Sequence, residues 1–279
     1  MNPLRPTAAE AQAEWARRVR ANGVQVDRFR QVGDGDLYAP VASMFRADPR
    51  RTGEPALDLL RGLARPEDTW LDIGAGGGRY ALPLALAARE VIAVEPSDGM
   101  IGVLREGMAE HGIANVRIER RRWPEGAAGL AADVALIAHV GYDVGPIGPF
   151  LDAMEAAARR LCVAVLLARP PSFALDALWP EVHGEPREAL PALPEFLALL
   201  LARGRLFEVR LCERSPQSYA SPEQVLALAR RQTWVQPGSA ADQRLQTLVA
   251  ARTQQRDGRY ALSWEPAAVA VVSWTPRSS

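Results

Sequence analysis

One short stretch constrains the fold of this chain more than any other. Residues 70–73 form an apolar strand, residues 74–78 read Gly-Ala-Gly-Gly-Gly, and residues 80–90 have a helical pattern. Residues 91–94 then form a second apolar strand, which ends on Glu95. This order is typical of the first half of a nucleotide-handling α/β sheet. The sequence therefore predicts a doubly wound, mostly parallel sheet.

The glycines and the acid in this stretch have a chemical purpose. Residues without a side chain let the backbone turn sharply at the carboxyl end of a strand, so that a ligand can approach the peptide groups. Glu95 stands at the end of the neighbouring strand, where a carboxylate can accept hydrogen bonds from both hydroxyls of a ribose. Together they predict a site for an adenosine-type cofactor.

The spacing of the glycines distinguishes between cofactors. A dinucleotide fingerprint needs its third glycine where this chain has Arg79. Gly74, Gly76 and Gly78, preceded by Asp72, instead resemble motif I of the class I S-adenosylmethionine-dependent methyltransferases. The alternatives are a glycine turn in an ordinary α/β protein and a dinucleotide site that has changed.

The resemblance implies a Rossmann-like sheet of seven strands, with the closing strand antiparallel, and a set of cofactor contacts. Glu95 corresponds to the family's ribose-binding acid, and the amino-acid tail of the cofactor is expected against the glycine turn. Residues 120–123 read Arg-Arg-Arg-Trp at the place where many relatives carry an acid for the adenine amine. Stacking on Trp123, or backbone groups, are therefore expected to replace the contact made by that acid. The expected cofactor-binding residues are Asp72, Gly74, Ala75, Gly76, Gly78, Glu95, Pro96, Ser97, Met100, Arg122, Trp123, Pro124, His139 and Val140.

Two residues after the fourth predicted strand are catalytic candidates. Methyl transfer from a sulfonium is an in-line displacement, so alignment and water exclusion can supply much of the acceleration without a strong base. His139 is able to take a proton from a hydroxyl, amine or thiol, because imidazole titrates near neutral pH. The alternative is that His139 only lines the cofactor pocket. Tyr142 is the second candidate, and the Asn-Pro-Pro-Tyr sequence of the amino-methylating branch is absent here.

The remaining sequence alternates between strand and helix patterns. Further strands are predicted at residues 116–119, 134–138, 161–167, 207–211 and 269–274, with helices at residues 97–111, 147–160 and 193–202. A first helix is predicted from a capping box at Thr7 and Glu10 to a stop at Gly23.

We expect an N-terminal helical extension over residues 1–54 and a core over residues 55–279. Two helical insertions, at about residues 169–191 and 213–261, exceed what the core requires. The first insertion begins at the carboxyl end of the fifth predicted strand, which is the ligand-binding edge of the sheet, so Trp179 and His183 are substrate-contact candidates. Tyr38 in the extension is a third candidate. Tyr38 and Phe45 either cover the cofactor or pack helices together. The second insertion either walls the substrate pocket or forms a homodimer surface.

Composition excludes several functions. The 279 residues carry a formal net charge of +0, which offers no bulk attraction for a nucleic acid. All 33 basic residues are arginine, so a Schiff-base lysine, a lysine phosphate loop and the Tyr-Lys pair of short-chain dehydrogenases are excluded. The three histidines and two cysteines show no zinc spacing, so no metal is expected. The sequence shows neither a signal core nor a membrane span, and we expect a cytoplasmic protein.

These observations predict an enzyme that transfers a methyl group from S-adenosylmethionine to a small-molecule acceptor. The neutral charge and the insertions at the substrate edge favour a metabolite over a macromolecule. A non-catalytic methyltransferase-like protein that binds the cofactor or assists assembly is the first alternative. A nicotinamide-dependent oxidoreductase is the second, and Arg79 and the missing lysine disfavour it.

Overall fold

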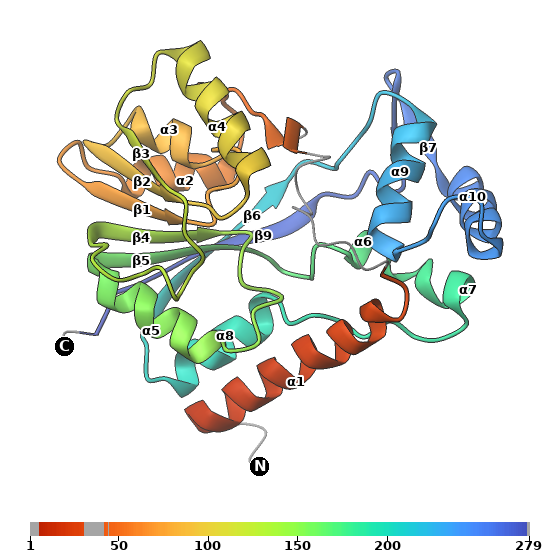
Figure 1. Ribbon diagram of the computed structural model, residues 1–279, viewed down its shortest axis with the longest axis horizontal. Coiled ribbons are helices and arrows are strands. Elements are labelled where there is room, and N and C mark those ends of the chain that lie inside the picture. The colour runs from red at the N-terminus through yellow and green to blue at the C-terminus, as the bar shows by residue number, and fades with distance from the viewer. Residues whose placement is uncertain (1–5, 31–41, 44, 278–279) are drawn as a thin grey trace.

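The computed structural model describes residues 6–30, 42–43 and 45–277, and Figure 1 shows its architecture. The helices of the described chain are α1 (Ala8–Asp27), α2 (Pro55–Leu63), α3 (Ala81–Ala85), α4 (Asp98–His111), α5 (Ile147–Ala157), α6 (Phe173–Asp176), α7 (Trp179–His183), α8 (Leu193–Ala202), α9 (Pro222–Thr233) and α10 (Ala240–Arg252). The strands are β1 (Thr69–Ile73), β2 (Glu90–Val94), β3 (Val116–Glu119), β4 (Ala132–Ala138), β5 (Ala158–Leu167), β6 (Phe207–Arg214), β7 (Gln254–Arg256), β8 (Arg259–Ala261) and β9 (Ala267–Trp274).

The central sheet has seven strands in the order β3-β2-β1-β4-β5-β9-β6. Strands β1 to β5 pair in parallel, and β9 runs antiparallel to both β5 and β6. The strand order reverses between β1 and β4, and ligands bind at such a switch point in open α/β sheets. The predicted fold class and the antiparallel closing strand are confirmed.

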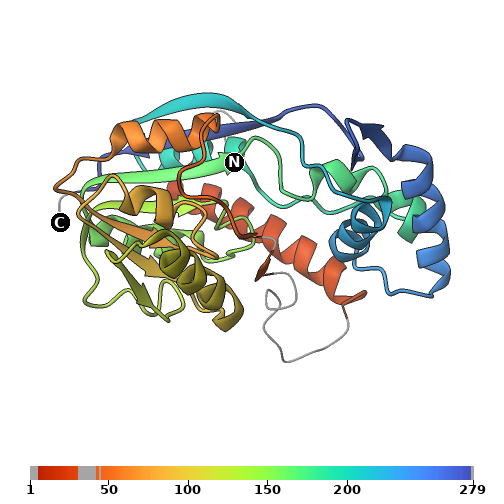
Figure 2. The same ribbon diagram turned by 90° about the horizontal axis from the view of Figure 1, so that it is seen from above.

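Helices cover both faces of the sheet, as a doubly wound fold requires (Figures 1 and 2). Helices α1, α5 and α8 pack on one face around a core that includes Trp15, Phe150 and Phe196. Helices α2, α3 and α4 cover the other face, around Leu57 and Leu104. The inner strands β1, β2 and β4 are therefore buried on both sides, which explains the nearly continuous apolar runs at these places in the sequence.

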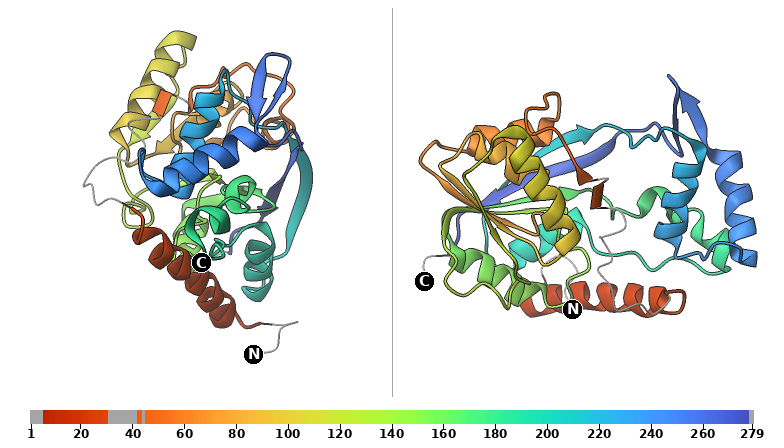
Figure 3. Two further views of the ribbon diagram at one scale, coloured as in Figure 1. Left: turned by 90° about the vertical axis from the view of Figure 1, so that its right-hand side faces the viewer. Right: turned by 45° about the horizontal axis from the view of Figure 1, so that its top comes forward.

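The two predicted insertions form a separate group of helices beyond the carboxyl edge of the sheet (Figure 3). Residues 169–191 contain α6 and α7, and the segment after β6 contains α9, α10 and the hairpin of β7 and β8. Apolar residues of both segments, such as Leu178, Val225 and Leu245, build a small core of their own. The division of the chain into extension, core and insertions stays a prediction.

The first helix is longer than predicted. Its capping box is present, because Glu10 N donates to Thr7 Oγ1 (3.2 Å) and Thr7 N donates to Glu10 Oε2 (2.9 Å). However, α1 continues through Gly23 to Asp27. Tertiary hydrogen bonds hold these last turns, since Asn22 Nδ2 donates to the carbonyl of Glu188 (2.6 Å). The distant partner overrides the helix-breaking tendency of the glycine.

Two other helices are shorter than predicted. Helix α3 ends at Ala85 rather than at residue 90, and the amide of Asn115 satisfies the carbonyl oxygens of Ala85 (2.8 Å) and Ala88 (3.1 Å). Helix α5 ends at Ala157, where β5 begins directly. In the described part of the chain, no helix combines the length and the apolar character needed to cross a bilayer.

Candidate cofactor and acceptor site

The glycine turn after β1 has the backbone conformation that only glycine adopts easily. Gly74, Gly76 and Gly78 have φ values of +77°, +55° and +84°. Gly74 N and Ala75 N both donate to the carbonyl oxygen of Val94, at 2.8 and 3.1 Å. The turn is thus tied to the end of β2, where the predicted ribose acid begins.

Glu95 closes the turn from the other side. The side chain is 6% exposed, and its two oxygens accept hydrogen bonds from Gly76 N and Ser97 N, each at 2.9 Å. A carboxylate accepts hydrogen bonds from more than two donors at once, which is the chemistry needed to bind the two hydroxyls of a ribose. Ser97 in turn caps α4 by accepting from Met100 N (3.1 Å).

Asp72 is buried below the turn with an incomplete set of partners. It is 2% exposed and accepts from the backbone N–H of Ala81, but Oδ1 has no hydrogen-bond partner in the structure. Burial, and then the nearby charge of Glu95, raise the pKa of Asp72 to about 7. A buried orphan carboxylate oxygen fits a cationic or hydrogen-bond-donating ligand group.

Replacing Asp72 with asparagine is expected to stabilise the ligand-free protein against urea at pH 8 and to change its stability little at pH 4. The folded-state pKa of about 7 lies above the unfolded value of 3.8, so ionisation costs stability as the pH rises between these values. Asparagine keeps an acceptor for Ala81 N and carries no charge. Asp98→Asn, at an exposed position, is the control, and an equal gain at both pH values would contradict the assignment.

His139 follows β4 in a conformation that is rare for its residue type. Its φ is +58°, and its backbone N–H donates to the carbonyl of Val165 (2.8 Å). The next residue, Val140, lies over the glycine turn, because a Cβ placed on Gly74 falls 2.7 Å from Val140 Cγ2. His139 therefore sits beside the predicted cofactor turn.

The His139 ring has one partner and one free nitrogen. Nε2 lies 3.2 Å from Tyr80 Oη, whereas Nδ1 is buried without a hydrogen-bond partner in the structure. Burial, followed by the charges of Arg214 and Arg79, lowers the pKa of His139 to about 3. The imidazole is accordingly neutral at physiological pH.

Tyr142 has a structural contact. Its hydroxyl accepts a hydrogen bond from Leu167 N (2.7 Å), and burial raises its pKa above the ordinary value. This contact ties the loop after β4 to the end of β5. A catalytic role for Tyr142 stays a prediction.

The residues after β3 that were predicted to contact the adenine do not present an exposed aromatic ring. Trp123 is only 9% exposed, its Nε1 donates to the carbonyl of Phe150 (3.2 Å), and the two rings meet edge to face. Arg122 is exposed and Pro124 is half-buried. The indole is thus committed to the core under α5, and its stacking on an adenine stays a prediction.

On the β2 side of the turn, Met100 is buried and its Sδ lies 3.9 Å from a Cβ placed on Gly76, whereas Pro96 is exposed. Among the predicted cofactor residues, the structure brings together Asp72, Gly74, Ala75, Gly76, Glu95, Ser97, Met100, His139 and Val140.

The predicted substrate residues of the first insertion pack against the end of α1. Trp179 is fully buried and meets Phe29 edge to face, with the ring centroids 5.6 Å apart. His183 stacks on the same Phe29 at 4.0 Å, and its Nε2 lies 2.8 Å from the carbonyl of Thr233. These contacts give both side chains packing roles, so their contact with substrate stays a prediction. Tyr38 lies outside the described residues.

Four residues near His139 were not predicted as site residues: Glu54, Arg79, Tyr80 and Arg214. Arg79 and Tyr80 directly follow the glycine motif, so their position was visible in the sequence. Glu54 and Arg214 come from the start of α2 and the end of β6, and only the fold brings them to the same edge.

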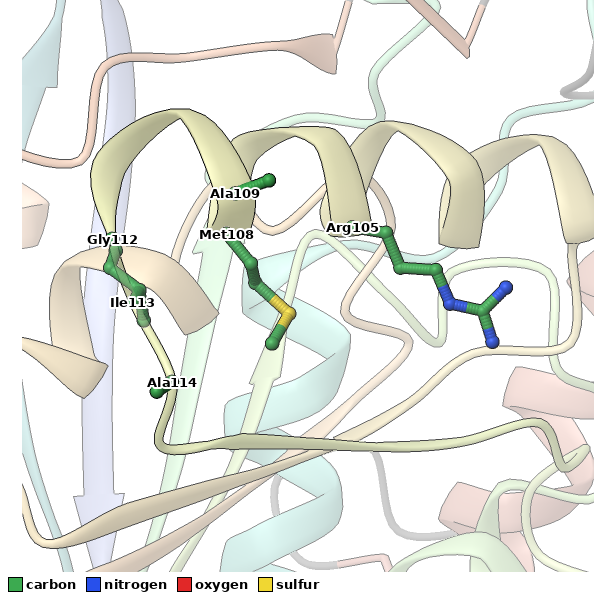
Figure 4. A pocket seen from close by; sticks show the side chains of 6 residues that line it. All are labelled: Arg105, Met108, Ala109, Gly112, Ile113 and Ala114. Carbon is green, nitrogen blue, oxygen red and sulfur yellow. The ribbon is translucent and has the colours of Figure 1, made fainter.

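Two surface hollows lie elsewhere. The first runs beside the C-terminal half of α4 and is lined by Arg105, Met108, Ala109, Gly112, Ile113 and Ala114 (Figure 4). The second lies behind the glycine turn, between α4 and residues 46–48. No predicted site residue lines either hollow. Within the described residues, no group of His, Cys, Asp and Glu side chains is arranged to hold a metal ion.

Solved structures with the same architecture are known. The YcgJ protein from Bacillus subtilis matches 81% of this chain and 99% of its own length, with a TM-score of 0.54 and 15% identity. A Bacillus halodurans protein that was assigned as a methyltransferase matches 79% of this chain and 99% of its own length, with a TM-score of 0.54 and 14% identity. The chain has the class I methyltransferase fold. At these identities, the likeness establishes the fold alone.

The sequence relatives of this chain match only parts of it. A mitochondrial ribosomal RNA small-subunit methyltransferase from Arabidopsis thaliana is 43% identical over 51 residues, which are 18% of this chain and 13% of that protein. A 23S rRNA uracil-C5 methyltransferase from Xanthomonas campestris is 40% identical over 62 residues, which are 22% of this chain and 14% of that protein. The chain thus spans about a seventh of these relatives' length. No protein-family model matches.

Proposed function

We propose that this protein is an S-adenosylmethionine-dependent methyltransferase. The observation that carries the proposal is the glycine turn after β1 and the adjoining end of β2, where Gly76 N and Ser97 N both donate to Glu95. Below this turn, Asp72 Oδ1 is buried without a hydrogen-bond partner. The partial identity to enzymes named as methyltransferases supports the same activity.

The residues present fit this cofactor. Glu95 is the acceptor that we assign to the ribose hydroxyls. The turn from Gly74 to Gly76 carries no side chain of its own beyond the methyl group of Ala75, so the amino-acid tail is expected to approach its backbone. Asp72 Oδ1 offers an acceptor for the ammonium group. When bound, the cofactor supplies an activated methyl group on a sulfonium. The loop with His139 and Val140 adjoins the turn, so a methyl acceptor is expected against this loop.

Titration calorimetry tests the cofactor assignment. We expect S-adenosylmethionine and S-adenosylhomocysteine to bind and NAD to show no comparable heat, because Arg79 stands where a dinucleotide fold needs its third glycine. Tight binding of NAD without binding of S-adenosylmethionine would overturn the proposal in favour of an oxidoreductase.

We further propose a small-molecule acceptor in place of RNA. The formal net charge of +0 provides no general attraction for a polyanion. The relatives that act on ribosomal RNA share less than a quarter of this chain in the two comparisons above, so their substrate does not extend to the whole protein.

Incubation with methyl-labelled S-adenosylmethionine separates these acceptors. A cell extract is divided into a small-molecule fraction and a total RNA fraction, and each is offered to the protein. Label is expected in small molecules. Label in RNA alone would refute the small-molecule acceptor, and cofactor binding without labelling of either fraction would favour the non-catalytic alternative.

A further inference from the structure

A chain of three side chains crosses the carboxyl edge of the sheet next to the glycine turn. Tyr80 Oη donates to Glu54 Oε1 (3.3 Å) and lies 3.2 Å from His139 Nε2. Glu54 precedes α2, Tyr80 precedes α3 and His139 follows β4, so three separate elements supply the chain.

We propose that Glu54 and Tyr80 are positioning residues that hold His139 as the neutral Nε2–H tautomer, leaving the lone pair of Nδ1 to accept a hydrogen bond from an O–H or N–H of the methyl acceptor. The inference rests on the proposed function and narrows it, because it selects acceptors that carry a transferable proton. The tautomer itself is a property of the protein without ligand.

The first step concerns the ionisation of Glu54. Arg51 Nε (2.7 Å) and Arg79 Nη2 (2.9 Å) both donate to Glu54 Oε2. Burial opposes ionisation, but these two arginines outweigh it and hold the pKa of Glu54 below its ordinary value. Glu54 is therefore an anion that can only accept hydrogen bonds.

The second step concerns the single proton of the Tyr80 hydroxyl. Burial and the charge of Glu54 raise the pKa of Tyr80, so the hydroxyl stays protonated. Glu54 and His139 Nε2 compete for this proton, and a carboxylate is the stronger acceptor because its hydrogen bonds are charge-assisted. With the proton directed to Glu54, Tyr80 Oη has only lone pairs for His139, so Nε2 must carry hydrogen.

The third step concerns the other nitrogen. A neutral imidazole with hydrogen on Nε2 has a bare Nδ1, and Nδ1 is buried without a partner in the structure. The charged groups that face the ring are Arg214 at the end of β6, Arg79 before α3 and Glu54 before α2. Two positive charges against one negative charge disfavour the imidazolium.

A bare Nδ1 beside the turn has a defined use. During methyl transfer, Nδ1 would accept a hydrogen bond from the acceptor's O–H or N–H and orient the acceptor's lone pair toward the methyl carbon. As the acceptor's bond to this carbon forms, the carbon–sulfur bond would break with its electron pair on sulfur, and the acceptor's proton would be lost to water. An imidazolium or an Nδ1–H tautomer has no lone pair on Nδ1 and cannot accept this hydrogen bond.

Nitrogen NMR of the folded, ligand-free protein labelled in histidine tests the inference directly. Only three histidines are present, and His111→Gln and His183→Gln variants assign their signals. Protonated and bare ring nitrogens have different chemical shifts. For His139 at pH 7 we expect the Nε2–H form to exceed the Nδ1–H form by about ten to one, from the advantage of a charge-assisted over a neutral hydrogen bond.

Two variants separate the proposed chain from mere packing. Tyr80→Phe removes the acceptor for Nε2–H, so the ratio should fall toward equal populations. Glu54→Gln removes the anion, so Tyr80 is free to donate to Nε2 and the Nδ1–H form should increase. Tyr260→Phe, in β8, should leave the ratio unchanged, and His183, whose Nε2 faces the Thr233 carbonyl, is an internal reference.

The outcomes are distinct. A dominant Nδ1–H form in the unmodified protein, or an unchanged ratio in both variants, overturns the inference. If Tyr80→Phe does not fold, Glu54→Gln decides alone. Calorimetry with S-adenosylmethionine on the same samples tests the proposed function separately: binding with the wrong tautomer overturns only this inference, whereas the expected tautomer without binding overturns the proposed function.

Discussion

Replacing Gly78 with alanine is expected to lower the free energy of unfolding by about 2–5 kcal/mol. The φ of +84° places any L side chain in a strained region, which costs about 1–2 kcal/mol. The new Cβ also falls 2.5 Å from Leu104 Cδ1 and 2.9 Å from Leu82 Cγ. Both leucines are buried, so the overlap must be relieved by shifting packed core, at about 1–3 kcal/mol. Urea unfolding measures the change.

Gly129 offers a matched control for this substitution. Its φ of +76° is close to that of Gly78, but a Cβ placed there has no neighbour within 4 Å. Gly129→Ala should therefore show only the backbone cost of about 1–2 kcal/mol. If the two variants were equally destabilised, the tight packing of the turn against α4 would be refuted.

Replacing Glu95 with alanine is expected to weaken S-adenosylmethionine binding by about 1–3 kcal/mol, or about 5- to 150-fold in Kd. The carboxylate is the acceptor proposed for the ribose hydroxyls. Its loss also leaves Gly76 N and Ser97 N without their 2.9 Å acceptors, which loosens the turn that receives the ligand. Calorimetry on the folded variant gives the affinity.

Two further variants show whether the loss of affinity comes from the Glu95 carboxylate. Glu95→Gln keeps the size of the side chain and one acceptor oxygen, so its affinity should lie between those of the wild type and the alanine variant. Glu110→Ala removes an exposed carboxylate on α4 that pairs with Arg46 and should leave the affinity unchanged. An unaltered Kd in Glu95→Ala would refute the ribose assignment.

Local signals in the sequence were sufficient for the parallel part of the sheet. Residues 116–119 were predicted as a strand and form β3 with the same bounds, and residues 193–202 form α8 as predicted. Both elements have apolar patterns that their neighbours in the fold reinforce. The bounds of α1 and α3 differed because distant partners, Glu188 for Asn22 and Asn115 for Ala85, hold the ends of these helices. Helix α5 ends early because Ala158 already pairs with Ala132 in the sheet.

The candidate site also contains residues that the local sequence predicted and residues whose surroundings only the fold decided. The positions of Asp72, Gly74, Gly76 and Glu95 follow from one continuous stretch, in which a strand, a turn and the next strand must place them together. Trp123 was different, because its sequence position beside the expected adenine gave no indication that Phe150 would accept its indole N–H.

The sequence by itself determined a glycine turn and an acid at the switch point of a doubly wound sheet, because the residues that build them are adjacent in the chain and their conformation depends on local backbone sterics. The tertiary structure alone decided the surroundings of His139. Glu54, Tyr80 and Arg214 reach that ring from positions far apart in sequence, and electrostatic and hydrogen-bond energies depend on distances that only folding fixes.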